Sequence, residues 1–163
     1  MPMKQKRVWL LSGLPGSGKS TWARQKIAEN GGVWCSRDEV RFSIVKENEE
    51  YFSHEDEVFN TWIKQINEVL ENPEVEDIYI DATHLNDKSR NKVLNRLTKN
   101  TDIEKITNVL FLTPLETCLE RNKQRSGRAV VPEEVIRNMV KSFQIPERYP
   151  VLFIKEGGEY FEW

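Results

Sequence analysis

Residues 13–20 read Gly-Leu-Pro-Gly-Ser-Gly-Lys-Ser, and they fill the pattern G-x-x-x-x-G-K-[ST] in full. The preceding residues 7–12 are β-branched and apolar without alternation, as in a strand that is buried on both faces. A helix is expected to follow from about Lys19. Because this pattern binds phosphate groups when it connects a buried strand to a helix, the stretch predicts a P-loop fold.

Each residue type of the loop has a chemical role. Glycines let backbone amides turn inward on the β- and γ-phosphates, the start of the helix adds a partial positive charge, and the Lys19 ammonium bridges phosphate oxygens. The Ser20 hydroxyl is expected to ligate magnesium, so ATP and Mg²⁺ are the expected cofactors. A glycine turn that only joins strand to helix is the weaker interpretation, because strand, spacing, lysine and hydroxyl are all present. The residues of this stretch predicted to bind the nucleotide are Gly13, Pro15, Gly16, Ser17, Gly18, Lys19, Ser20 and Thr21.

Strands and helices are expected to alternate along the rest of the chain. Further strands are expected at residues 33–35, 78–81, 107–112 and 151–154. Helices are expected after the loop 36–39, over 53–70 with a capped start at Ser53 and Asp56, after Asp87, from 113–114 through 121, and from Pro132. This order predicts an α/β fold: a parallel sheet of about five strands, flanked by helices on both faces, with ligand-binding loops at the carboxyl ends of the strands.

Length and composition indicate a single domain over residues 1–163. A chain of 163 residues can close a hydrophobic core, and no run is long enough to cross a membrane. Cys35 and Cys118 have neither zinc-site nor disulfide spacing, so a reducing cytoplasm is expected. The net charge is only −2, but acidic residues dominate from Glu29 to Asp77 and basic ones from Asn86 to Arg128. One face could therefore suit polyanions, although solvated helix faces explain each run taken alone.

A carboxylate and an arginine follow the second predicted strand, beside the place that an acceptor must occupy. Asp38 could act as the general base that accepts the hydroxyl proton, while Arg41 holds an acceptor phosphate or orients Asp38. An isolated Asp-x-x-Arg is more often an N-cap with a surface arginine. The neighbouring P-loop favours the catalytic interpretation here.

The loop after the third predicted strand carries a second acidic residue. Asp81 closes this strand as a Walker B carboxylate would, within reach of the magnesium shell or of Arg41. Ser20 and Asp81 are thus the predicted metal-binding residues. Asn86 is expected to cap the following helix, and His84 is expected to be a loop residue and not a ligand or base.

Arginines also precede a glycine in the segment of about 121–132, which is predicted to form a lid. Arg121 and Arg125 are spaced i and i+4, so they are expected to share one helix face above the phosphates. Arginines there would stabilise charge on the transferring group, and closure would exclude water. A solvated basic helix end is the alternative if this run stood alone.

Taken together, these residues resemble the 5′-kinase domain of phage polynucleotide kinase/phosphatase and its P-loop kinase relatives, over nearly the whole chain. The matching stretches are residues 13–24, Arg37-Asp38 with Arg41, Thr83-x-Leu85-Asn86, and Arg121-Asn122-x-x-Arg125 followed by Ala129–Pro132. The resemblance implies that Lys19 and Ser20 bind phosphate and magnesium, that Asp38 is the general base, that Arg41 faces the acceptor's phosphate, and that Arg125 and Arg121 are lid arginines. It implies catalytic roles for Lys19, Asp38, Arg41 and Arg125.

Two departures limit this resemblance. In the phage enzyme the third-loop aspartate directly precedes the threonine, whereas Ala82 separates Asp81 from Thr83 here, so the partner of Arg41 stays open. The lid is also one residue longer before Pro132. The sequence contains no Asp-x-Asp-Gly-Thr motif of the phosphatase half, so we expect no phosphatase activity.

The expected function is transfer of the γ-phosphate of ATP to the 5′-hydroxyl of DNA or RNA, with a nucleic acid as partner and no membrane. A groove lined by the basic stretch Lys88–Arg128 and by Trp34, Phe42 or Phe52 would favour this acceptor. A closed pocket would instead favour a small molecule, such as a nucleoside, a sugar nucleotide or an antibiotic, or a tRNA-linked substrate. A third possibility is an ATP-binding regulatory module that transfers nothing and docks through residues 47–57.

Overall fold

The structure is a computed structural model that describes residues 5–99, 102–155 and 160–162 of the chain. The strands are β1 (Lys6–Ser12), β2 (Val33–Ser36), β3 (Asp77–Asp81), β4 (Ile103–Phe111), β5 (Val151–Ile154) and β6 (Tyr160–Glu162). The helices are α1 (Lys19–Asn30), α2 (Arg37–Ile44), α3 (Glu55–Glu71), α4 (Asp87–Leu94), α5 (Leu115–Lys123), a short 3₁₀ turn (Gly127–Ala129) and α6 (Glu133–Lys141).

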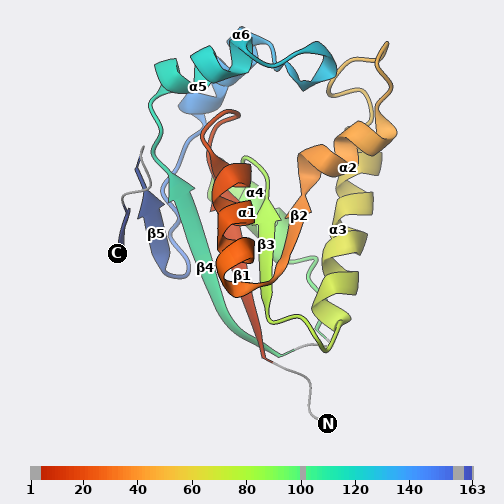
Figure 1. The fold of residues 1–163 in the computed structure, drawn as a ribbon, viewed down its shortest axis with the longest axis vertical. Helices are drawn as coiled ribbons and strands as arrows, with labels where there is room; N and C mark the ends of the chain where they lie inside the picture. Colours follow the sequence, from red (N-terminus) through yellow and green to blue (C-terminus); the bar gives the residue numbers. More distant parts are fainter. Residues whose placement is uncertain (1–4, 100–101, 156–159, 163) are drawn as a thin grey trace.

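These strands form one sheet in the order β2-β3-β1-β4-β5-β6. The first five strands pair in parallel, and β6 pairs antiparallel with β5. The predicted P-loop kinase-like α/β fold with five parallel strands is confirmed, and β6 is an addition. All loops that follow the parallel strands open at one edge of the sheet, below α5 and α6 (Figure 1).

Helices cover both faces of the sheet, as the unbroken apolar runs predicted. On β1, Val8 and Leu10 pack with α3 and α4, including Trp62, which is fully buried. Trp9 and Leu11, which alternate with Val8 and Leu10 along the strand, point to the other face of the sheet, where they pack with α1. Each of these four apolar β1 side chains thus packs against a helix on its own face of the sheet, which fixes the position of the glycine loop that follows.

The start of α3 differs from the prediction. The helix begins at Glu55 after His54, which provides no side-chain cap, so the predicted capped start at Ser53 and Asp56 is wrong. The Ser53 hydroxyl instead donates a 2.7 Å hydrogen bond to the carbonyl of Glu50 within the preceding turn. Acidic residues fill the first turn of α3. Their negative charges interact favourably with the positive end of the helix dipole and so stabilise the start of the helix, although no side chain caps it.

The helix after β3 has the predicted cap. Asn86 accepts a hydrogen bond from the backbone of Ser89, and the Ser89 hydroxyl bonds to the Asn86 backbone in return, which forms a capping box. In the described part of the chain, no helix is both long enough and apolar enough to cross a bilayer.

A buried histidine joins the loop after β3 to the end of β1. His84 is 3% exposed, adopts a positive φ of 40°, and donates from Nδ1 to the carbonyl of Leu11 at 2.5 Å. Burial lowers the pKa of His84 to about 3. His84 is therefore the loop residue that the sequence analysis expected, and its neutral ring fixes the loop beside the glycine-rich turn.

This histidine should make stability fall in acid. Below about pH 6.5 the unfolded chain binds a proton that the folded His84 does not, so the free energy of unfolding should drop by about 1.4 kcal/mol per pH unit until the folded pKa is reached. In His84→Asn, which tolerates the left-handed backbone, this dependence should be absent. Urea unfolding of both proteins from about pH 7 to about pH 4 tests this, and parallel curves would contradict it.

Candidate active site

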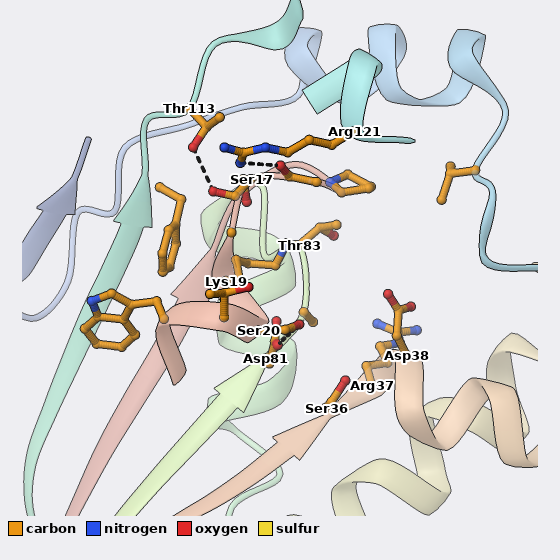
Figure 2. Close-up of a pocket in the computed structure, with 18 of the residues that line it drawn as sticks. Ser17, Lys19, Ser20, Ser36, Arg37, Asp38, Asp81, Thr83, Thr113 and Arg121 are labelled. Carbon is orange, nitrogen blue, oxygen red and sulfur yellow. Dashed lines mark hydrogen bonds between the residues drawn. The ribbon is translucent and has the colours of Figure 1, made fainter. Parts of the chain in front are cut away.

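A cavity of about 580 Å³ lies at the carboxyl edge of the sheet. It is lined by residues that follow β1, β2, β3, β4 and β5, and by the segment between α5 and α6. Figure 2 shows Lys19 and Ser20 on one side of this cavity and Asp38 across it. The topology therefore brings the donor-side loop and the predicted acceptor-side carboxylate to one space.

Backbone geometry explains the glycines of the loop. Gly16 and Gly18 have φ values of 83° and 97°, in the left-handed region that disfavours other residues. A Cβ at Gly16 would also lie 2.8 Å from the carbonyl oxygen of Cys118 in α5. Gly13 does not line the cavity, although it was predicted to bind the nucleotide; a Cβ there would meet the Ser17 hydroxyl at 2.6 Å. Its role is close packing behind the loop.

The Lys19 ammonium is buried inside the loop. Its Nζ donates to the carbonyls of Gly13 and Leu14, both at 3.0 Å. Burial lowers the pKa of Lys19, and the negative charges of Asp81 and Asp38 oppose this effect. The loop therefore holds a cation directed at its own centre, where a phosphate would replace the carbonyls as the partner.

Three elements meet at the Asp81 carboxylate. The hydroxyl of Ser20 in α1 donates to Asp81 Oδ2 at 3.0 Å, and the indole of Trp34 in β2 donates to the same oxygen at 2.8 Å. Burial raises the pKa of Asp81, whereas Lys19 and these two donors act in the opposite direction. The contact between Ser20 and Asp81 brings the two predicted metal ligands together. A hydroxyl beside one carboxylate fits Mg²⁺, which takes few protein ligands and completes its shell with water and phosphate.

On the acceptor side, the partner of Arg41 is Glu55 and not Asp81. Arg41 Nε and NH2 donate to the two Glu55 oxygens at 2.9 and 3.0 Å, and NH1 donates to Asp38 and to the Tyr51 hydroxyl. Arg41 is only 5% exposed, so its guanidinium is fully engaged and does not present a free face to an acceptor phosphate. Asp38 itself is accessible, with 44% of its side chain exposed.

Sequence reasoning missed Tyr51 and Glu55. Glu55 belongs to an acidic run that was interpreted as a solvated face or docking surface, and Tyr51 lies in the loop between α2 and α3. One feature of the sequence pointed to Glu55. Ala82 separates Asp81 from Thr83, unlike in the phage enzyme, so the usual carboxylate partner of Arg41 is displaced and another acidic residue is needed.

The two lid arginines both line the cavity but do not share a helix. Arg121 lies in α5 and donates to the carbonyl of Gly16 at 3.0 Å, above the loop (Figure 2). Arg125 lies beyond the end of α5, in the turn before the 3₁₀ segment. The predicted i, i+4 arrangement is therefore wrong, because the helix ends at Lys123, but both side chains still reach the phosphate-binding end of the cavity.

Most of the described basic side chains of Lys88–Arg128, which would favour a polynucleotide acceptor if they lined a groove, lie outside the cavity. Among these described side chains, only Arg121 and Arg125 line it. In α4, Arg90 is 2% exposed and bonds to Ser12 and Asp87, and Lys92 lies over the ring of Phe59. Of the predicted aromatic residues, Phe52 lines the cavity, whereas Trp34 and Phe42 do not.

The sequence matches one family model, described as an AAA domain, over residues 8–146. The chain belongs to this AAA domain family. The match includes the glycine-rich loop, the ends of β2 and β3 and the segment between α5 and α6.

Solved structures share the fold of this AAA domain. One is a chain in a Pnkp1/Rnl/Hen1 RNA repair complex, with a TM-score of 0.69 and 23% identity over 86% of our chain and 45% of that chain. A gluconokinase from Sinorhizobium meliloti 1021 has a TM-score of 0.59 and 16% identity over 98% and 86% of the two chains. Chaetomium thermophilum Kti12 in complex with ADP-AlF3 has a TM-score of 0.61 and 16% identity over 93% and 90%. The AAA domain thus spans less than half of the first of these chains, and its P-loop fold implies nucleotide binding.

Replacing Lys19 should weaken nucleotide binding. The lysine supplies the charge-assisted contact of the loop, which is worth about 1.5–3 kcal/mol, so Lys19→Ala should raise the Kd for ADP by at least about tenfold. Isothermal titration calorimetry measures this. Lys64→Ala removes the same charge from the exposed face of α3 and should leave the Kd unchanged. Equal affinities for the two variants would contradict the assignment.

Proposed function

We propose that this AAA domain transfers the γ-phosphate of ATP to an alcohol, and that the alcohol is the 5′-hydroxyl of a polynucleotide. The observation that carries the proposal is the position of Asp38, an accessible carboxylate across the cavity from the buried Lys19 ammonium (Figure 2). A phosphate-binding loop facing an accessible carboxylate is what in-line transfer to a hydroxyl requires.

Each residue of the cavity has a role in this proposal. Asp38 accepts the proton of the acceptor hydroxyl as its oxygen attacks the γ-phosphorus. Lys19, Arg121 and Arg125 stabilise the negative charge on the transferring group. Ser20 and Asp81 would hold Mg²⁺, which neutralises charge on the phosphates when bound.

Three observations support a polynucleotide acceptor. The sequence resembles the 5′-kinase domain of phage polynucleotide kinase/phosphatase at the residues quoted above, and one structural neighbour is part of an RNA repair complex. In addition, Phe52 is 42% exposed at the acceptor end of the cavity, where an unpaired base could stack.

A small hydroxyl compound is the second candidate acceptor. It is favoured by the engagement of Arg41 with Glu55 and by the basic residues of α4, which lie outside the cavity and so provide no positive track for a strand. A gluconokinase is among the structural neighbours.

Offering a panel of acceptors separates these candidates. With labelled ATP and magnesium, we expect label on 5′-hydroxyl oligonucleotides of DNA or RNA, and little on nucleosides, gluconate or water. Label only on a small molecule would overturn the polynucleotide proposal but keep the phosphotransferase. Slow hydrolysis with no acceptor labelled would instead support a regulatory module.

Removing the candidate base should separate chemistry from binding. Asp38→Asn keeps the size of the side chain but cannot accept a proton, so kcat should fall by about 10²–10⁴-fold while the Kd for ADP stays the same. Glu39→Gln, a neutralisation at the next and exposed position of α2, is the matched control and should retain activity. If Asp38→Asn transferred phosphate at the wild-type rate, Asp38 would not be the base.

A further inference from the structure

A closed network of hydrogen bonds surrounds one oxygen of Asp38. Arg41 NH1 and the Tyr51 hydroxyl both donate to Asp38 Oδ1, and Arg41 NH1 also donates to the Tyr51 oxygen at 2.8 Å. In the described part of the chain, no hydrogen bond to Oδ2 is found. One oxygen is therefore fixed by the protein, and the other is left to meet a hydroxyl.

Arg41 in turn is fixed by Glu55. Two contacts of 2.9 and 3.0 Å to the two carboxylate oxygens form a bidentate pair, which restrains both the position and the plane of the guanidinium. The Arg41 guanidinium also lies 4.3 Å from the centre of the Tyr51 ring. With 6% of its side chain exposed, Arg41 has few other conformations available.

Glu55 makes one further contact that bears on its charge. Arg37 NH2 donates to Glu55 Oε2 at 3.1 Å, while its guanidinium lies over the rings of Phe59 and Trp62. Glu55 thus compensates two arginines, and its loss would leave both cations beside the cavity, with Asp38 as the other carboxylate that acts on them. A guanidinium without its partner would then be drawn towards Asp38 or the solvent.

We infer that Glu55 and Tyr51 are positioning residues, which hold Asp38 in the orientation needed to accept a proton, Glu55 by fixing Arg41 and Tyr51 by bonding Asp38 directly. This inference rests on the proposed function. It changes the role of Arg41 from a residue that holds an acceptor phosphate to one that orients the base. It also gives the loop between α2 and α3, which contains Tyr51, and the first residue of α3, Glu55, a part in orienting the base.

Two variants test the inference on the acceptor that the wild-type protein uses. Tyr51→Phe removes one hydrogen bond to a charged group and should lower kcat by about tenfold. Glu55→Gln should lower kcat by about 10–100-fold, because it removes the charge that restrains Arg41. In both, KM for ATP should stay within about twofold of wild type. Asp56→Asn removes one charge from the adjacent, exposed position of α3 and should leave kcat unchanged.

Thermal unfolding of each variant separates positioning from folding. Tyr51→Phe keeps the ring, so its Tm should stay close to that of the wild type while kcat falls. If both variants keep wild-type kcat, or if kcat falls only in proportion to the folded fraction, the inference is overturned.

A crystal structure of Glu55→Gln gives a readout that needs no acceptor. We expect Arg41 to leave its site and Asp38 to adopt more than one rotamer. Unchanged positions of both side chains would contradict the inference. If wild type labels no oligonucleotide but this rearrangement is seen, the proposed acceptor is wrong and the positioning network stands. In that case kcat of the same variants is measured with the small-molecule acceptor, or, if no acceptor is labelled, as the rate of ATP hydrolysis.

Discussion

The buried ammonium of Lys19 is the constraint on which the site depends. A cation removed from water is costly unless it has hydrogen bonds and opposite charges nearby. The carbonyls of Gly13 and Leu14 supply the hydrogen bonds, and Asp81 at the end of β3 and Asp38 in the first turn of α2 supply the charges. The two carboxylates that have roles in the proposed reaction therefore also compensate the charge of the glycine-rich loop.

Parallel sheet topology makes this compensation possible. Because β2, β3 and β1 are adjacent and parallel, the residues that follow them meet at one edge, although Lys19, Asp38 and Asp81 are far apart in sequence. Trp34 adds a restraint that crosses the sheet, since its indole in β2 bonds to Asp81 in β3. The donor side of the cavity is thus held by the rigid core, and the acceptor side by α2 and the loop before α3.

The sequence predicted the donor side better than the acceptor side for a physical reason. A glycine loop between strand and helix has local geometry that its residues dictate, so the P-loop could be anticipated. The Ser20–Asp81 contact could be anticipated from the fold, because the carboxyl ends of parallel strands meet at one edge of the sheet. The Arg41–Glu55 pair depends on how α3 packs against α2, and no local pattern encodes it. Likewise, the basic spacing of α4 gave no sign that Arg90 is buried against Ser12.

The phosphate-binding side of the cavity and the side that carries Asp38 also differ in how firmly the fold holds them, which bears on how the proposed reaction could be controlled. The phosphate loop needs left-handed glycines and a close approach to α5, so its shape is set by folding alone. Asp38 is different, because it is half-exposed and one of its oxygens is held by Arg41 of the same helix and by Tyr51 of the following loop. Under the proposed function, an acceptor that enters beside Tyr51 and Phe52, which line the cavity, would contact the side chains that orient Asp38. In the proposed reaction, acceptor fit and orientation of Asp38 would therefore be coupled, so a poorly fitting acceptor would meet a misaligned carboxylate even when ATP is bound.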